Sequence, residues 1–342
     1  MAIKGLELGY DILLEKPISP VKKELLNLLK VQKKTGGKVL VCHVLRYAPA
    51  YLKMKDLIDK GEIGQVIKME SIERVAYWHE AHSFVRGNWH VEKDTSPMIM
   101  AKCCHDLDII QWLVGSKCKT VYSTGGLTFF KKENQPKDAS NTCKDCKYKM
   151  TCPYSAELQY PVRFTEQDNK QGWPFNVLVP DKVPFDAEDV RKAYENSNYG
   201  HCVFDCNNDV VDHQQVEMVF ENGVKASHTM TAFTAPSGRR FDIHGTYGEI
   251  MFDEDQNFIR LYKYNGLSKS EIIEWKLNEL TEFLETKGFG HGGGDAMMIK
   301  KFYNILEGKV EAETSLEKSI ESHLIALAAE ESRKKNKVIK MK

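Results

Sequence analysis

Lys16 stands at the abrupt end of a short apolar run, residues 11–15 (DILLE), and is followed at once by Pro17. A run of this kind, bounded by a turn residue, is typical of a buried parallel strand. In a sheet with helices on both faces, ligands bind outside the carboxyl ends of the strands. An amine placed there could stabilise negative charge that develops on a reacting oxygen. An ordinary solvated lysine at a strand end would show the same local pattern.

A histidine and a carboxylate one helical turn apart form a second candidate group. Segment 96–113 has the apolar spacing of a helix, in which His105 and Asp108 share a face with Lys102 at its edge. A carboxylate can hold an imidazole in one tautomer, and the imidazole can then accept a proton near neutral pH. The competing interpretation is a polar helix face whose histidine makes only structural hydrogen bonds.

A group of cysteines has the spacing of a metal site. A closed zinc site needs four ligands, and a Cys-x-x-Cys turn followed by a third thiol supplies three of them. The predicted zinc ligands are Cys143, Cys146, Cys152 and Cys202. Cys206 and His201 are substitutes for the fourth ligand. An iron–sulfur cluster is a distant second possibility after zinc, because nothing else in the sequence indicates electron transfer. Free cysteines in a reducing compartment are the alternative to both.

The composition limits the classes of protein to consider. The chain has 342 residues, enough for two domains, and its 48 basic residues balance its 48 acidic ones. This balance does not favour a nucleic-acid or membrane surface as partner. No apolar run reaches the roughly 18 residues that span a bilayer, and the N-terminus lacks the layout of a signal peptide. The odd count of nine cysteines favours a reducing, cytoplasmic location.

The first part of the chain alternates strands and helices. Residues 11–15 and 38–43 are predicted strands, and residues 20–35 and 47–60 are predicted helices. This pattern predicts the C-terminal half of a Rossmann-like parallel sheet over residues 1–62. No glycine-rich phosphate turn precedes it. The glycine-rich segment 290–294 lacks a preceding strand, so we do not interpret it as a dinucleotide fingerprint.

Residues 63–342 are predicted to form an α+β domain with a large, mainly antiparallel sheet. Tight links between apolar segments, such as the Glu221-Asn222-Gly223 hairpin signal, indicate antiparallel neighbours. Residues 295–306 and 315–334 are predicted closing helices. A cysteine-rich insertion at about 134–206 is expected to be poor in regular structure. The predicted strands are 66–77, 120–130, 210–220, 224–233, 241–245, 249–252, 258–264 and 271–276.

Two sequence blocks resemble the Gfo/Idh/MocA oxidoreductases. They are LLEKP at 13–17 and HDLDIIQWLVG at 105–115, the latter on the histidine-bearing helix. Further blocks at 86–89, 209–214, 290–295 and 322–333 resemble one cysteine-containing branch of that family. The resemblance covers nearly the whole chain. It implies an NAD(P)-dependent dehydrogenase of carbohydrate metabolism, acting on a sugar or cyclitol-like substrate, in a homo-oligomer that is a dimer or tetramer.

The resemblance also implies roles for individual residues. Hydride would pass between the nicotinamide and a carbinol or keto carbon, while Lys16 hydrogen-bonds the reacting oxygen and His105 moves the hydroxyl proton. Lys102 and Asp108 are expected to support them. The Lys16–Pro17 bond is expected to be cis, as is common in the family. The implied cofactor-binding residues are Glu15, Lys16, Pro17 and Arg46. The implied substrate-binding residues are Arg86, Trp89 and His213.

The chain departs from the family pattern in two places. Many members carry an aspartate four residues before the histidine, where this chain has Ala101, and Lys102 is expected to take over part of its role. Members also begin with a strand and a glycine-rich turn that this sequence lacks. We therefore expect an N-terminally truncated form of a longer enzyme, in which the residue that selects NAD or NADP is missing.

Two other functions fit the same resemblance. An NAD-dependent glycosidase that oxidises, eliminates and reduces would turn over glycosides without a net change in NADH. A non-catalytic sugar- or nucleotide-sensing protein would have no need for both Lys16 and His105, and this chain carries both.

Overall fold

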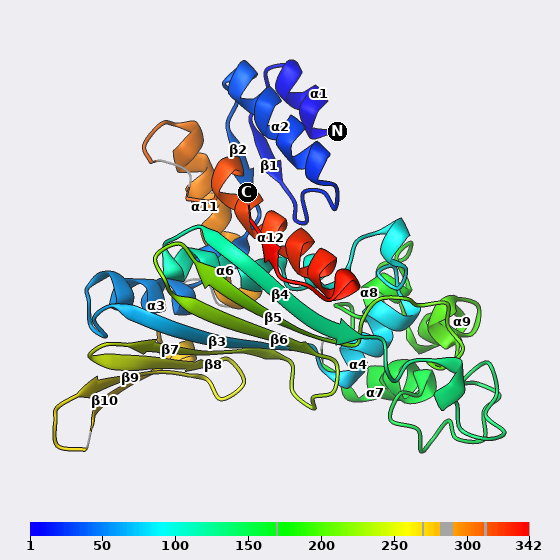
Figure 1. The fold of residues 1–342 in the computed structure, drawn as a ribbon. Coiled ribbons are helices and arrows are strands. Elements are labelled where there is room, and N and C mark those ends of the chain that lie inside the picture. Colours follow the sequence, from blue (N-terminus) through cyan, green and yellow to red (C-terminus); the bar gives the residue numbers. More distant parts are fainter. Residues whose placement is uncertain (169, 269, 281–289, 311–312, 342) are drawn as a thin grey trace.

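The fold contains two β-sheets joined by shared helices (Figure 1). It was obtained as a computed structural model, which describes residues 1–342 except 169, 269, 281–289, 311–312 and 342. A two-stranded parallel sheet lies at one end, and a nine-stranded sheet forms the body of the molecule. These features confirm the predicted combination of a Rossmann-like fragment with a large, mainly antiparallel sheet.

The small sheet is built from apolar branched residues. Strand β1 (Ile12–Leu14) pairs in parallel with β2 (Val39–Val41), as the alternating pattern predicted. Helix α2 (Lys22–Thr35) connects them, buries Leu25 and Leu28, and ends where Gly36 adopts a left-handed conformation. Only glycine enters that conformation at little cost, so Gly36 stops the helix.

The large sheet has the strand order β10-β9-β8-β7-β3-β6-β5-β4-β11. Side chains alternate between buried and exposed along β5, as a strand with one covered face requires. All its neighbours are antiparallel except β3 and β6, which are parallel. Its strands are β3 Val66–Arg74, β4 Cys118–Gly126, β5 His213–Phe220, β6 Lys225–Thr231, β7 Gly238–Gly245, β8 Gly248–Asp253, β9 Phe258–Tyr264, β10 Ser270–Lys276 and β11 Ile339–Lys340.

The predicted helix 96–113 is divided in two. Helix α5 (Met98–Ala101) and helix α6 (Cys104–Val114) are separated at Lys102 and Cys103. The other helices are α1 Ala2–Glu7, α3 Pro49–Asp59, α4 Tyr77–Glu80, α7 Arg163–Glu166, α8 Phe175–Leu178, α9 Ala187–Glu195, α11 Gly294–Leu306 and α12 Leu316–Lys335. Short 3₁₀ or π turns are η1 Val44–Tyr47, η2 Ala81–Arg86, η3 Glu92–Asp94, η4 Lys132–Asn134, η5 Leu158–Val162, η6 Asn198–Gly200, η7 Leu277–Glu279 and η8 His291–Gly293.

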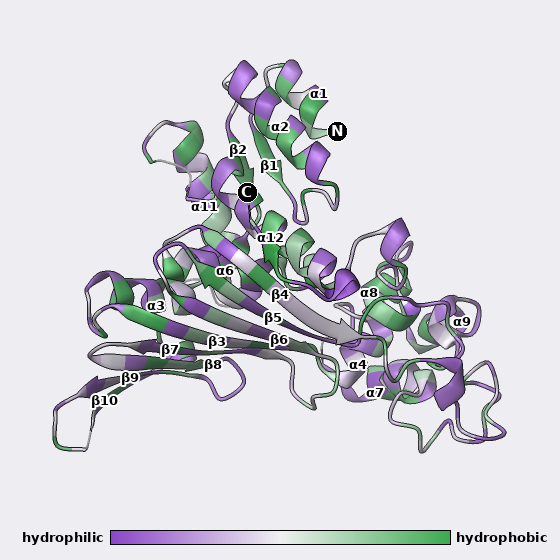
Figure 2. Ribbon diagram, viewed as in Figure 1, coloured by the Kyte–Doolittle hydropathy of each residue, from purple (hydrophilic) through white to green (hydrophobic). Residues whose placement is uncertain are grey.

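Helix α12 connects the two parts of the fold. Its first turns bury Leu316 and Ile320 in the core of the small sheet, and later turns bury Ile325 and Ala329 under the large sheet. Figure 2 shows the helix becoming hydrophilic toward its C-terminal end. No helix in the described part of the chain is long and apolar enough to cross a membrane.

The cysteine-rich insertion is more regular than predicted. Helices α7, α8 and α9 lie within 134–206 and extend from one end of the large sheet (Figure 1). Helix α9 begins with a capping box in which Asp186 and Asp189 exchange hydrogen bonds with each other's backbone. Aromatic packing gives this segment its own core, formed by Cys143, Ala156, Tyr160, Phe164, Phe175, Leu178, Phe185, Val190 and Tyr194.

The domain boundary near residue 62 stays a prediction. Helix α3, which precedes it, packs into the core of the large sheet through Tyr51, whose ring meets Phe241 and Phe252 at centroid distances of 6.1 and 5.3 Å. Residues before the predicted boundary therefore help to bury the sheet that follows it.

Candidate functional site

Lys16 and His43 follow the two parallel strands of the small sheet. Leu14 is paired with Val41 at the strand ends, so residues two positions further on leave the sheet at the same carboxyl edge. The Lys16–Pro17 bond is cis, as expected. A hydrogen bond holds the turn that follows: the Ile18 N–H donates to Nε2 of His323 at 2.9 Å. His323 also bonds the Ser319 carbonyl through Nδ1, at 3.0 Å. Its neutral ring thus positions the lysine turn against α12.

His105 is a buried base without a hydrogen-bond partner. Its side chain comes from the first turn of α6 and the residue is 4 % exposed, yet neither ring nitrogen has a partner among the described residues. Burial lowers the pKa of His105 well below 6.5, and the positive charge of Lys16 lowers it further. Buried polar atoms are normally satisfied. An unsatisfied imidazole beside a lysine is therefore suited to receive a ligand hydroxyl.

His43 completes this group and was not singled out in the sequence. Its ring is fully buried, 6.0 Å from that of His105 and 5.6 Å from that of His323 between centroids. Burial lowers the pKa of His43 to about 3, so the ring is neutral at physiological pH. Its position at the end of the predicted strand 38–43, like that of Lys16 after the predicted strand 11–15, was the available signal.

Asp108 does not orient His105, contrary to the prediction. Its two carboxylate oxygens accept hydrogen bonds from Nε and Nη2 of Arg46, each at 2.6 Å. His43 Nε2 lies 3.7 Å from the same carboxylate. Arg46 is equally committed: Nη1 donates to the Glu313 carbonyl at 3.2 Å, and the residue is 2 % exposed. The guanidinium expected to contact the nucleotide is instead part of a buried ion pair.

Lys102, which was expected to support Lys16 and His105, is paired with a buried carboxylate. Its amine lies 3.2 Å from Glu73 of β3, whose other oxygen is 2.8 Å from Arg239 of β7. Nε of Arg239 in turn donates to Asp106 at 2.8 Å. Burial raises the pKa of Asp106 even beside this guanidinium. Lys102 is therefore one end of an alternating chain of charges that connects α6 to the large sheet.

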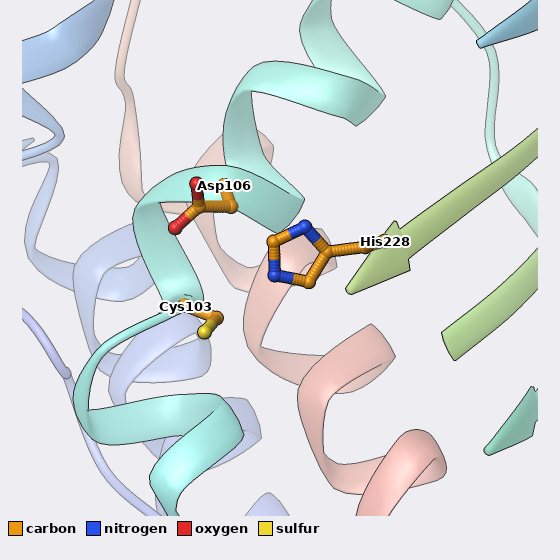
Figure 3. A group of neighbouring side chains, drawn as sticks. All are labelled: Cys103, Asp106 and His228. Atoms are coloured by element: carbon orange, nitrogen blue, oxygen red, sulfur yellow. The ribbon is translucent and has the colours of Figure 1, made fainter. Parts of the chain in front are cut away.

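Cys103, Asp106 and His228 bring three potential metal-ligand atoms together (Figure 3). All three residues are buried. Asp106 is already neutralised by Arg239, and Nδ1 of His228 shares a 2.9 Å hydrogen bond with the Ser71 hydroxyl. These partners explain the group as packing around the buried arginine, so we assign no metal to it.

The glycine-rich segment that the sequence left unassigned lies beside His105. The His291 ring is 5.9 Å from that of His105, and its Nδ1 lies 3.0 Å from Asp295. A side chain at Gly294 would come within 2.5 Å of the Val44 carbonyl oxygen. Glycine is thus required for the close approach of this segment to the turn after His43.

The predicted substrate residues do not gather around His105. Arg86 is buried among the cysteines of the insertion, and its Nη2 lies 3.6 Å from the Cys143 sulfur. Nδ1 of His213 is 2.8 Å from Asp212 at the start of β5. Trp89 is 36 % exposed. Of the residues expected near the cofactor, Glu15 is exposed and interacts with the thiol of Cys42, whose pKa is raised to about 12 by burial and then by Glu15.

An aromatic group lies on the other side of Lys102. The Trp173 ring contacts the rings of His79 and Trp78, at centroid distances of 4.8 and 5.3 Å. The guanidinium of Arg163 lies 4.1 Å over the Trp78 ring. Burial, and then the charge of Lys102, lowers the pKa of His79 to about 2. Flat apolar faces next to cations suit a ligand with both C–H faces and hydroxyl groups.

The four predicted metal ligands lie around one hollow in the insertion. It is small, with a cavity volume of about 20 Å³, and Arg86 lines it as well. Its cysteines are Cys143, Cys146, Cys152 and Cys202.

The fold combines a Rossmann-like sheet edge, which carries Lys16 beside the buried His105, with a large sheet. The family model described as "Oxidoreductase family, C-terminal alpha/beta domain" (GFO_IDH_MocA_C) matches residues 55–341. The chain belongs to the Gfo/Idh/MocA family of oxidoreductases.

Individual relatives agree with this membership. The protein named "Putative oxidoreductase YteT" of Bacillus subtilis (strain 168) is 24% identical over 309 residues, covering 88% of this chain and 68% of its own. Inositol 2-dehydrogenase 2 of Saccharopolyspora erythraea is 29% identical over 121 residues, 35% of this chain and 32% of that enzyme.

Solved structures share the fold. An oxidoreductase domain protein from Kribbella flavida superposes with a TM-score of 0.69 at 16% identity, covering 100% of this chain and 77% of that one. Levoglucosan dehydrogenase in complex with NADH and levoglucosan gives a TM-score of 0.68 at 16% identity, covering 100% and 76%.

Proposed function

We propose that this protein is an NAD(P)-dependent oxidoreductase of a sugar or cyclitol-like alcohol. The observation that carries the proposal is the unsatisfied, buried imidazole of His105 next to Lys16 at the carboxyl edge of a parallel sheet. Two relatives support it. One is an inositol 2-dehydrogenase that is similar over part of this chain, and the other is levoglucosan dehydrogenase, which shares the fold and binds NADH.

The two residues have complementary tasks in this proposal. A bound nicotinamide would accept or supply hydride at the carbinol carbon. Lys16 donates a hydrogen bond to the oxygen on that carbon and stabilises its developing negative charge. His105, neutral because burial lowers its pKa, accepts the hydroxyl proton during oxidation and returns it during reduction.

The described residues fit one end of the cofactor. Lys16 and the turn after His43 form the strand-end edge where a nicotinamide would lie, and the orphaned His105 nitrogens face a group that the protein itself does not provide. Within the described part of the chain, no glycine-rich strand–turn–helix segment is available for a pyrophosphate. The fit therefore supports the reacting end, and phosphate binding needs a direct test.

The aromatic group near Lys102 supports the proposed substrate class. Trp78, Trp173 and His79 offer ring faces, and Lys102 and Arg163 offer positive charge. Sugars and cyclitols present C–H faces and many hydroxyl groups, which such a surface can bind.

The first experiment titrates the chain with NADH and NADPH and follows energy transfer from its tryptophans. Saturable binding with a Kd of about 1–100 µM supports the cofactor assignment. Addition of myo-inositol and levoglucosan with the oxidised cofactors then tests turnover by absorbance of the reduced nicotinamide. No binding of either nucleotide would contradict the proposal for this chain.

We further propose that the protein acts in the cytoplasm as a homo-oligomer that pairs through the open face of the large sheet. The outward side chains there are polar and alternate with the buried ones; they include Lys68, Glu70, Gln215, Glu217, Arg240 and Asp242. Light scattering of the purified protein should give a dimer or tetramer. A monomer at all concentrations would contradict this arrangement.

A further inference from the structure

The cysteine hollow has features that neither packing nor catalysis at His105 explains. Its four thiols come from distant parts of the chain, the turn at 143–152 and the segment around Cys202, yet they line one space. All nine cysteines of the chain are unpaired, so the four do not close the hollow by disulfides. Cys143 and Cys202 are buried, at 7 % and 8 % exposure, and Cys146 and Cys152 are half-buried.

The spacing of the thiols distinguishes one metal ion from several. A tetrahedral zinc with Zn–S bonds of about 2.3 Å places its sulfurs about 3.8 Å apart. Among the described residues, the one group of three or more ligand atoms mutually within 4.8 Å is Cys103, Asp106 and His228. No three of the four hollow-lining sulfurs are therefore that close together. Their spacing is wider than that of the ligands of a single tetrahedral ion.

We propose that Cys143, Cys146, Cys152 and Cys202 hold a [4Fe–4S] cluster in this hollow. A cubane cluster carries its irons on the outside, each bound by one thiolate, so its ligands stand wider apart than those of a single zinc. The zinc site predicted from the sequence used the same ligands, and the wide spacing is the reason to replace it.

The surroundings match the charge of such a group. An oxidised cluster core with four thiolates carries two negative charges, and a buried anion needs a compensating partner. Arg86 is 2 % exposed, lines the hollow, and directs Nη2 to the Cys143 sulfur at 3.6 Å. Gln135 donates to the Cys202 sulfur at 3.6 Å. Donors to the sulfurs are the usual surroundings of iron–sulfur thiolates.

Arg86 also shows what the cluster would hold together. Its Nε donates to the His201 carbonyl at 2.8 Å and its Nη2 to the Tyr154 carbonyl at 2.7 Å. One guanidinium thus connects the π turn η2 with both cysteine-bearing segments. The cluster would fasten the two cysteine-bearing segments to each other, in a structural role. This inference is independent of the proposed dehydrogenase activity.

Assembly balances without a further oxidant or reductant. The four thiols release protons as four iron–sulfur bonds form, and equal amounts of ferric and ferrous iron with sulfide supply the core. The test is therefore anaerobic incubation of the full chain with ferric and ferrous salts and sulfide, followed by desalting. We expect about four iron and about four acid-labile sulfide per chain, with broad visible absorption that dithionite bleaches.

Matched serine variants assign the ligands. Cys146→Ser should lose most of the iron, whereas Cys206→Ser should keep it. Cys206 is equally half-buried in the same region but does not line the hollow, and a serine can keep its bond to the Cys202 carbonyl. Equal iron loss in both variants would overturn the ligand assignment.

If a variant does not fold, the zinc and iron content of the wild-type chain still tests the site. About one zinc per chain without iron would overturn the cluster in favour of the sequence prediction. Absence of both metals after incubation with each would overturn any metal site in the hollow.

Discussion

Helix α6 carries two kinds of buried polar side chain, and they differ in whether the protein satisfies them. Asp106 and Asp108 are each neutralised by an arginine from another element, Arg239 and Arg46. His105, next to Asp106 in sequence, has no hydrogen-bond partner in the described structure. The paired carboxylates join α6 to the large sheet and to the turn after β2. The unpaired imidazole makes no such bond, which leaves it available to a ligand.

The same contrast separates His43 from His323, whose ring centroids are 5.6 Å apart. His323 uses both ring nitrogens for backbone contacts and fixes the turn after Lys16. Neither nitrogen of His43 has a hydrogen-bond partner among the described residues. His323, whose ring nitrogens both have hydrogen-bond partners, therefore serves the fold. His43, whose ring nitrogens have none, belongs to the candidate site.

The largest expected effect is a loss of stability in acid. Burial lowers the pKa of His43, His82 and His228 from 6.5 to about 3, 3 and 4. Below pH 6.5 the unfolded chain binds protons that the folded chain cannot, so stability falls as pH falls toward 4. Each such histidine contributes up to about 1.4 kcal/mol per pH unit in that window. Urea unfolding between pH 7.5 and about 5 measures it. Unchanged stability over this range would contradict the burial of these rings.

Arg239→Met should be the most damaging single substitution for stability. It leaves Asp106 and Glu73 buried without their shared cation, which costs about 3–5 kcal/mol. Arg240→Met is the matched control on the same strand. The Arg240 side chain is 46% exposed, so loss of its pair with Asp242 should change stability by less than about 1 kcal/mol. Comparable urea midpoints for the two variants would contradict the distinction between buried and exposed pairs.

Lys16→Ala and His105→Ala should each remove about 3 kcal/mol or more of transition-state stabilisation while leaving the fold intact. The expected readout is a drop in kcat/KM of about 100-fold or more with unchanged thermal unfolding. His244→Ala, a half-exposed histidine on β7, serves as control. Wild-type kcat/KM in both variants would sink the assignment of these two residues.

His323→Ala should have the smallest effect. The Ile18 N–H loses its acceptor, so stability should fall by about 1–3 kcal/mol. Because Lys16 is two residues away, kcat should fall as well, and a glutamine at position 323 should restore part of both. A loss of stability with full activity would show that the lysine turn is positioned by other contacts.

The sequence predicted the elements better than the contacts between them. Lys16 at a strand end and His105 on a helix follow from local patterns, and most strands and helices lie close to their predicted ranges. Local pattern could not show that Asp108 would pair with Arg46, 62 residues away, instead of with His105. That choice depends on how α6 packs against η1. The division of the predicted helix at Lys102 and Cys103 likewise left no local signal, and Lys102 pairs there with Glu73 on a distant strand.

The cysteines and the glycine-rich segment show the same limit. The sequence spacing of Cys143, Cys146 and Cys152 predicted that they form one group. How far apart their sulfurs lie could be learned only from the structure. Segment 290–294 was tested against one known motif and set aside. Its actual task, a close backbone approach to Val44, leaves no periodic signal in a sequence.

The bridge from Ile18 to His323 spans 305 residues, and it has a consequence for biosynthesis. As the ribosome extends the chain, α2 and β2 emerge well before α12, the helix that covers them. Until then the apolar side chains of Val39, Val41 and Leu25 have no complete shelter. Contacts between residues so far apart in sequence form slowly, and apolar surface stays exposed until they form. We therefore expect chaperones to bind the α2–β2 segment while the residues up to α12 are translated.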